Sequence, residues 1–267
     1  MTQDFAILIP ARYASTRFPG KPLAMLRGIG GEPRSLIERS WRTATAVATP
    51  EQVWVATDDQ RIAEHVTGFG GQVVMTPESC RNGTERCAAA LEVLGEVASV
   101  IVNLQGDAPL TPAFVVADLA RALEADPSAA LATPAVDCSP SLYEHLVGDQ
   151  RAGRVGGTTV VGNSAGHALY FSKRVIPHRP EGDSEAFRAT RLHLGVYAYR
   201  PAALRKYSAL PPGLLEQSEG LEQLRFLEHG LVIRLVSFAP LEWDCIELNN
   251  PQDVPVIEAI LQARGIS

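Results

Sequence analysis

The stretch FAILIPARYASTRFPGKPL, residues 5 to 23, joins an apolar strand to a loop that carries several cations. Its first six residues form a run without polar alternation, which is typical of a strand covered on both faces. Arg12, Arg17 and Lys21 follow among prolines and Gly20. A packing role needs no such cations, so the loop is a candidate anion site, with a solvated basic loop as the alternative.

Strand-like and helix-like segments alternate over the first half of the chain. Further strands are predicted at 52–57, 71–76, 99–105 and 129–136, and amphipathic helices at 34–47, 59–69, 84–95 and 112–126. This alternation predicts βαβ units and an α/β fold with a mostly parallel, twisted, doubly wound sheet. Ligands of such sheets bind where strands end and helices begin.

The pattern changes after residue 136, where Gly-rich and polar segments become frequent. We expect the later strands to form the sheet edge and a projecting β-rich element, and the last helix to return to the main sheet. No repeat or linker is evident, so 1–267 is predicted to be a single domain. The sequence predicts strands at 156–162, 167–172, 192–200 and 231–238, and helices at 201–210, 219–230 and 251–265.

Composition excludes several classes of protein. A hydrophobic content of 46% and a mean hydropathy of +0.01 fit an ordinary globular core. The formal charge of −6 argues against nucleic-acid or anionic-membrane binding. No apolar run approaches membrane-spanning length, and we expect a cytoplasmic protein. The four cysteines form no CxxC pair, so reduced thiols are expected.

The cationic loop is not a Walker A loop, although it contains Gly20-Lys21. Ser15 stands where that motif needs its first glycine, and Pro22 where it needs Ser or Thr. The loop still offers two guanidiniums, an ammonium and the hydroxyls of Ser15 and Thr16. Such donors suit a polyphosphate, since Arg gives forked hydrogen bonds and Lys a mobile charge.

Two further motifs could carry chemistry. In NLQGDAP (103–109), Asp107 ends an apolar strand and could bind a hard cation, with a simple turn or helix cap as the alternative. In RNGTER (81–86), Asn82 and Gly83 make a turn and Thr84 opens a helix. This segment could read a base edge, but a capped helix start explains it nearly as well.

These motifs resemble one known family. IPARYASTRFPGKPL, ATDD (56–59), NGTER, VNLQGDAP, ALYFSKRVIP (168–177), HLGVYAYR (193–200) and LEQLRFLEHG (221–230) occur in its order and at its separations. The chain is similar to the 3-deoxy-manno-octulosonate cytidylyltransferases, the CMP-Kdo synthetases of lipopolysaccharide biosynthesis, as a divergent member. The resemblance implies a Rossmann-like nucleotidyltransferase fold that forms CMP-Kdo and pyrophosphate from CTP and the sugar acid. It also implies Mg²⁺ as cofactor and a homodimer.

The resemblance also implies roles for individual residues. Residues 1–136 would mainly bind CTP, and 137–267 would mainly bind the sugar and form the dimer. Lys21, Arg12 and Asp107 would be catalytic, with Lys21 stabilising charge on the α-phosphate. Arg12, Ser15, Thr16, Arg17 and Lys21 would hold the phosphates. Pro10, Ala11, Asn82, Gly83, Thr84, Glu85 and Arg86 would surround cytidine, and Gln105, His193, Tyr197, Glu222 and Gln223 would lie on the sugar side.

Several positions depart from the family pattern. Ala108 replaces a Glu, and Asn249 replaces the Asp expected as second Mg²⁺ ligand after Asp107. Glu247, two residues earlier, is the alternative ligand. Thr159 and Leu192 replace cations in the sugar half, which keeps open another acid sugar, such as a nonulosonate or amino-Kdo. A catalytically impaired nucleotide-binding homologue is the alternative from another class.

Overall fold

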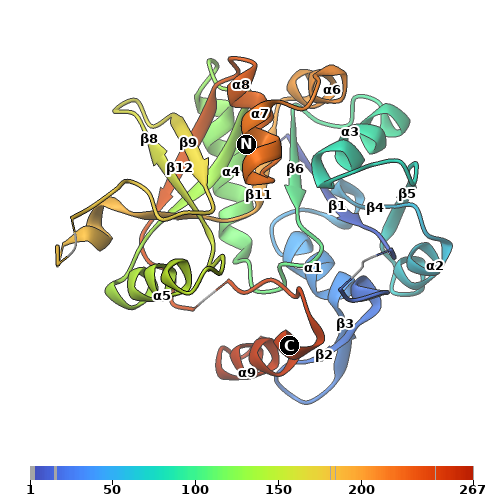
Figure 1. Ribbon diagram of the computed structural model, residues 1–267. Helices are drawn as coiled ribbons and strands as arrows, with labels where there is room; N and C mark the ends of the chain where they lie inside the picture. The colour runs from blue at the N-terminus through green and yellow to red at the C-terminus, as the bar shows by residue number, and fades with distance from the viewer. Residues whose placement is uncertain (1–3, 15–16, 181, 184, 244, 267) are drawn as a thin grey trace.

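One ten-stranded sheet forms the centre of the computed structural model, which describes residues 4–14, 17–180, 182–183, 185–243 and 245–266 (Figure 1). A separate hairpin pairs β2 (Met25–Arg27) with β3 (Pro33–Ser35). The strands of the main sheet are β1 (Phe5–Ala11), β4 (Val53–Thr57), β5 (Gln72–Met75), β6 (Val100–Leu104), β7 (Leu131–Asp137), β8 (Thr158–Gly162), β9 (Ala168–Ser172), β10 (Arg191–His193), β11 (Val196–Tyr199) and β12 (Ile233–Phe238).

The helices lie on both faces of the sheet and around its ends (Figure 1). No helix in the described part of the chain combines the length and apolar character needed to cross a membrane. The helices are α1 (Leu36–Thr45), α2 (Gln60–Gly68), α3 (Gly83–Leu94), α4 (Ala113–Ala125), α5 (Pro140–Arg151), α6 (Pro201–Ala209), α7 (Leu214–Glu219), α8 (Leu224–Glu228) and α9 (Val254–Ala263), with the short 3-10 turn η1 (Lys21–Leu23).

The strand order is β5-β4-β1-β6-β11-β7-β10-β8-β9, and β12 also pairs with β7. β5, β4, β1 and β6 are all parallel, as the alternating pattern predicted. β11 enters the sheet antiparallel between β6 and β7, and β10 and β9 also run against their neighbours. The mostly parallel α/β fold is therefore confirmed, with antiparallel strands inserted on the side of β7.

Side chains of each central strand enter two different cores. Ile7 and Ile9 of β1 pack with α1, α2 and α4, whereas Leu8 packs on the other face with α3, α6 and α8. This explains why the strands read as continuous apolar runs. Among the described residues, the four cysteines form no disulfide.

The second half of the chain departs from the predictions in several places. The strand predicted at 192–200 is divided, because Val196 N–H donates to the Leu194 carbonyl in a tight turn at Gly195. The expectation that the later strands form the sheet edge is confirmed for the β8–β9 pair, which ends the sheet, but it is wrong for β10 and β11, which lie inside it. The helix predicted at 219–230 is shorter, at α8. The hairpin β2–β3 and the helices α5 and α7 were not predicted.

The last helix does not return to the main sheet as expected. Ile257 and Leu261 of α9 pack instead with Leu26 of β2, Leu36 of α1 and Leu110 in a third, smaller core. Figure 1 shows α9 beside β2 and β3, below the main sheet. The apolar face of α9 thus packs on the short hairpin. The segment before α9 passes beside the loop that follows β6, where Leu248 N–H donates to the Asp107 carbonyl.

Candidate active site

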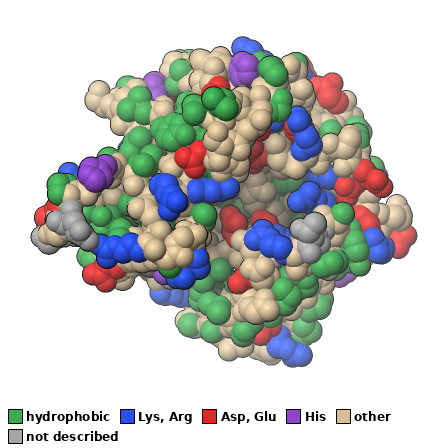
Figure 2. Space-filling model, viewed as in Figure 1, with side chains coloured by type: hydrophobic (Ala, Val, Ile, Leu, Met, Phe, Trp, Pro, Cys, Tyr) green, Lys and Arg blue, Asp and Glu red, His purple; other side chains and the backbone are tan. Residues whose placement is uncertain are grey.

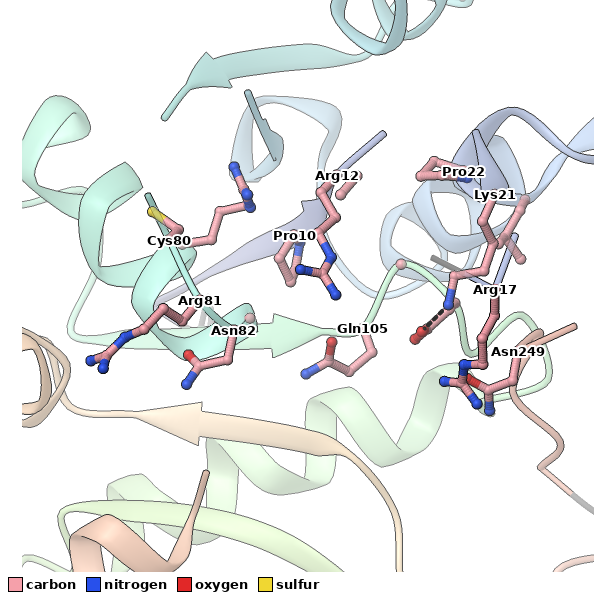
Figure 3. Close-up of a pocket in the computed structure, with 16 residues that line it drawn as sticks. Pro10, Arg12, Arg17, Lys21, Pro22, Cys80, Arg81, Asn82, Gln105 and Asn249 are labelled. Atoms are coloured by element: carbon pink, nitrogen blue, oxygen red, sulfur yellow. Dashed lines mark hydrogen bonds and ion pairs between the residues drawn. The ribbon is translucent and has the colours of Figure 1, made fainter. Parts of the chain in front are cut away.

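A cleft opens where β1 and β6 end and α3 begins. β1 and β6 are parallel neighbours, so their carboxyl ends meet at one edge of the sheet. The cleft has a volume of about 340 Å³. Figure 2 shows acidic and basic side chains meeting around a hollow in this face, and Figure 3 shows the lining side chains. They are Pro10, Ala11, Arg12, Arg17, Lys21, Pro22, Leu36, Cys80, Arg81, Asn82, Gly83, Arg86, Gln105, Gly106, Asp107 and Asn249.

Lys21 and Asp107 form an ion pair at one side of this cleft. The Lys21 ammonium lies 2.6 Å from the Asp107 carboxylate, and both side chains are largely shielded from solvent. Gly20 has a left-handed φ of 70° and its N–H donates to the Tyr13 carbonyl, which turns the loop sharply into η1 at Lys21. Gly106 lets the end of β6 pass close to β1, because a Cβ there would lie 2.8 Å from the Pro10 carbonyl oxygen.

The other loop cations also reach the cleft. Figure 3 shows Arg12 above Gln105, and Lys21 and Arg17 to the right of it, on the side of Asn249. The Arg17 guanidinium donates to the Asn249 side-chain oxygen at 3.0 Å, which joins the two ends of the chain. Ser15 and Thr16 lie outside the described residues. The cationic loop is thus a wall of the cleft and not a separate surface.

The segment 247–249 runs beside Asp107. Leu248 N–H donates to the Asp107 carbonyl at 2.8 Å, and the Leu248 side chain is buried. The Asn249 amide nitrogen donates to the Glu247 carboxylate at 3.4 Å, so these two side chains lie on the same side. Desolvation and the charge of Asp107 raise the pKa of Glu247. Glu247 and Asn249, the two candidates for the second metal ligand, are therefore both close to Asp107.

The start of α3 forms the opposite wall. The Asn82 side chain caps the helix by accepting from Glu85 N–H at 2.8 Å, and its amide nitrogen donates to the Tyr207 hydroxyl at 3.0 Å. Arg86 is almost fully buried and donates to Thr76 and to the Asp58 carboxylate, 2.8 Å away. The predicted helix cap is therefore confirmed, and the capped turn also lines the cleft.

Sequence reasoning missed five lining residues, of which Cys80 and Arg81 have ionisable side chains; the others are Pro22, Leu36 and Gly106. Arg81 is the first residue of the RNGTER motif, and a cation directly before the predicted turn was the available signal. Its guanidinium is held by Glu85, at 2.9 Å from the arginine Nε. Glu85, which was expected near cytidine, therefore acts as the partner that positions Arg81. Cys80 carried no signal, because its own segment has no metal-ligand or redox spacing.

Several predicted residues do not line the cleft. Thr84 is fully buried, since its hydroxyl lies 2.8 Å from the Tyr199 hydroxyl in the core. His193 is also buried, 2.9 Å from the Thr133 hydroxyl, and burial lowers its pKa to about 3. The Tyr197 hydroxyl donates to buried Gln223 at 3.1 Å. These side chains lie in the core beneath the cleft.

Glu222 occupies a second hollow, which shares Arg81 and Asn82 with the cleft. Its carboxylate accepts from Thr84 N–H, at the first turn of α3, at 3.2 Å. Burial raises the pKa of Glu222 to about 7, against the opposing effect of that hydrogen bond. Among the predicted sugar-side residues, Glu222 thus both lines a hollow and has a raised pKa.

Comparisons with known proteins identify the family of the chain. The sequence matches the family model described as Cytidylyltransferase over residues 6–233. The 3-deoxy-manno-octulosonate cytidylyltransferase of Maricaulis maris is 46% identical over 258 residues, which cover 97% of each chain. The mitochondrial 3-deoxy-manno-octulosonate cytidylyltransferase of Arabidopsis thaliana is 38% identical, over 97% of this chain and 84% of that one.

Solved structures give the same result. CMP:2-keto-3-deoxy-manno-octonic acid synthetase complexed with CTP aligns with a TM-score of 0.82 at 34% identity, covering 98% of this chain and 99% of that one. A cytidylyltransferase from Leptospira borgpetersenii, 14% identical with a TM-score of 0.58, shares the fold. By sequence over nearly its whole length and by fold, the chain belongs to the 3-deoxy-manno-octulosonate cytidylyltransferase, or CMP-Kdo synthetase, family.

Proposed function

We propose that this protein is a Mg²⁺-dependent cytidylyltransferase that forms CMP-Kdo and pyrophosphate from CTP and Kdo, or a close 2-keto-3-deoxy sugar acid. Its product would serve lipopolysaccharide or surface polysaccharide synthesis. The observation that carries the proposal is the convergence of Arg12, Arg17 and Lys21 in the cleft at the ends of β1 and β6. A relative that covers nearly the same length was solved with CTP.

The triphosphate would lie against the loop after β1. Arg12, Arg17 and Lys21 supply three positive charges on a chain whose net charge is −6, so local attraction must hold the anion. The prolines and the turn at Gly20 restrict the loop before the nucleotide arrives, which lowers the entropy lost on binding. The Lys21–Asp107 pair keeps the ammonium inside the cleft in the meantime.

The cytidine would lie toward α3. Base edges are read by fixed backbone and amide groups, and Asn82, Arg81 and the main chain at Pro10 and Ala11 all line that part of the cleft. Asn82 is held by its helix cap and by Tyr207, so its position is set before binding.

The reaction joins an acceptor hydroxyl to the α-phosphorus of CTP. A new oxygen–phosphorus bond forms, the bond to the bridging oxygen breaks, pyrophosphate leaves with its electron pair, and the hydroxyl proton is released. The protein mainly positions the two reactants and neutralises charge on the phosphoryl oxygens. Lys21 lies at the junction of the phosphate loop and Asp107, where it would stabilise the α-phosphate.

The residues beside Lys21 fit Mg²⁺. This cation prefers one or two carboxylates completed by phosphate oxygens and water. Asp107 supplies one carboxylate, and Glu247 and Asn249 lie next to it with a second carboxylate and an amide oxygen. The described residues contain no cluster of three or more His, Cys, Asp or Glu side chains suited to a metal. When bound, Mg²⁺ would neutralise charge on the phosphates.

The altered positions in the second half give little support to another acceptor. Thr159 is buried, and its hydroxyl donates to the Arg174 carbonyl and accepts from Ile176 N–H. Leu192 packs against Gly157 and pairs with β7. Neither side chain lines the cleft. Kdo is the preferred acceptor because the relatives of this chain are 3-deoxy-manno-octulosonate cytidylyltransferases.

An acceptor panel tests the proposal. The protein would be incubated with CTP, Mg²⁺ and, separately, Kdo, amino-Kdo or a nonulosonate, and pyrophosphate release would be measured. We expect release with Kdo. Release with a nonulosonate alone would exclude the acceptor that we prefer, and CTP binding without release from any sugar acid would identify an impaired homologue. The homodimer and the cytoplasmic location stay predictions, and analytical ultracentrifugation would test the former.

A further inference from the structure

Leu248 fixes how the C-terminal segment meets Asp107. Its N–H donates to the Asp107 carbonyl, and its side chain is buried in the third core with Leu110 and Ile257. Glu247 and Asn249, on either side of it, are hydrogen bonded to each other and lie outside that core. The backbone contact thus brings both side chains near Asp107, where Asn249 lines the cleft and Glu247 lies against it.

The two side chains have different surroundings. Both ends of the Asn249 amide are engaged, because its oxygen accepts from Arg17 at 3.0 Å and its nitrogen donates to Glu247. The Glu247 carboxylate extends toward Gly195, where a Cβ would lie 3.6 Å from its Oε1 and 3.7 Å from Cγ of Gln105. Glu247 and the predicted sugar-side residue Gln105 therefore approach the same glycine.

Glu247 and Asn249 differ in charge, which makes them unequal as metal ligands. Two carboxylates held near each other repel, and a divalent cation between them relieves that repulsion. The neutral Asn249 amide offers no charge, and a metal on its oxygen would lie beside the Arg17 cation that the same oxygen already accepts from. Lys21 balances one of the two carboxylates through its pair with Asp107.

We propose that Glu247, with Asp107, holds the divalent cation, and that Asn249 instead orients Arg17 toward the phosphates. The inference rests on the proposed function, because it assumes a metal–nucleotide substrate. It assigns the second carboxylate to the residue that the Leu248 contact places near Asp107. Asn249 is then a positioning residue that acts through the guanidinium of Arg17.

Direct cation binding tests this assignment. Free Mn²⁺ would be measured by electron paramagnetic resonance with the protein and α,β-methylene CTP, which cannot react. Even outer-shell groups are worth about 10- to 100-fold in metal affinity, so we expect Glu247→Gln to weaken Mn²⁺ binding by about that factor or more. Asn249→Ala should keep the Mn²⁺ affinity and weaken metal-free binding of the analogue. Glu242→Gln is the matched control, since Glu242 is exposed and paired with Arg264.

The outcomes separate the two proposals. Unchanged Mn²⁺ affinity in Glu247→Gln, with a loss in Asn249→Ala, would overturn the assignment and return the metal to Asn249. A loss in Glu247→Gln with none in Asp107→Asn would overturn the pairing of the two carboxylates. If Asp107→Asn and Glu247→Gln both bound Mn²⁺ like the unchanged protein, the metal part of the proposed function would fail, whereas pyrophosphate release tests the nucleotidyl transfer itself. Circular dichroism would establish that each variant is folded.

Discussion

Glu222→Gln should make the protein more stable at alkaline pH. The Glu222 carboxylate accepts from Thr84 N–H at the start of α3, and a glutamine oxygen can accept the same hydrogen bond. Burial raises the pKa of Glu222 from 4.5 to about 7. The folded chain therefore binds a proton there more tightly than the unfolded chain does. The substitution removes that ionisation and keeps the shape of the side chain.

The sign and size follow from linkage. Stability from this group is fully present below pH 4.5 and is lost as pH rises through about 7, because ionisation then costs more in the folded state. At about 1.4 kcal/mol per pH unit the loss at pH 8 is at most about 3 kcal/mol, and partial solvent access reduces it. One kcal/mol shifts Tm by about 2–4 °C in a chain of this size, so we expect Glu222→Gln to raise Tm by roughly 5 °C at pH 8.

Differential scanning calorimetry at pH 5 and pH 8 measures the effect. The Tm difference between variant and unchanged protein should be small at pH 5 and positive at pH 8. Glu92→Gln is the matched control on α3, since Glu92 is exposed and paired with Arg205, and its difference should not depend on pH. An equal Tm difference at both pH values, or a lower Tm at pH 8, would refute the reasoning.

Three further substitutions test the site and its supports. Lys21→Ala should lower kcat by about 100-fold or more, as loss of a transition-state contact does, with a smaller change in CTP affinity; steady-state kinetics showing the reverse would exclude its α-phosphate role. Gly106→Ala should lower the free energy of unfolding by about 1–3 kcal/mol in urea titrations, because its Cβ would meet a β1 carbonyl. Gly68→Ala, at an open position of α2, is the control and should not destabilise. Arg225→Met should cost about 3–5 kcal/mol, because it leaves the Glu216 carboxylate buried without its partner at 2.6 Å; a loss below about 1 kcal/mol would show that the pair behaves like a surface one.

The parts of the fold set by local pattern could be predicted. β1, β4 and β6 are buried on both faces, so their sequences are apolar runs, and the helices between the strands show the helical period of their apolar residues. The cationic loop after β1 was also predictable, because it directly follows the apolar run that predicts the strand. The hairpin β2–β3 was not, because strands of three residues leave almost no periodic signal.

The second half of the chain was harder to predict, because its elements depend on contacts between residues far apart in the sequence. The division of 192–200 comes from one tight turn at Gly195, and β11 then enters between two strands formed much earlier in the chain. His193 and Thr84 carried the right polar chemistry for a ligand site. Their burial against Thr133 and Tyr199 is a property of packing that neither spacing nor residue type reveals.

The segment 247–249 shows how packing far from the cleft can determine which side chains lie beside Asp107. Without the third core, the segment 247–249 could slip by one position and present Leu248 to Asp107. Fully burying a leucine is worth about 1.5–3 kcal/mol, which opposes that slip. The Leu248 N–H bond to the Asp107 carbonyl fixes the same register from the backbone. The packing of α9 on the β2–β3 hairpin, which the sequence did not predict, thereby determines that Asn249 lines the cleft and that the Glu247 side chain meets it there.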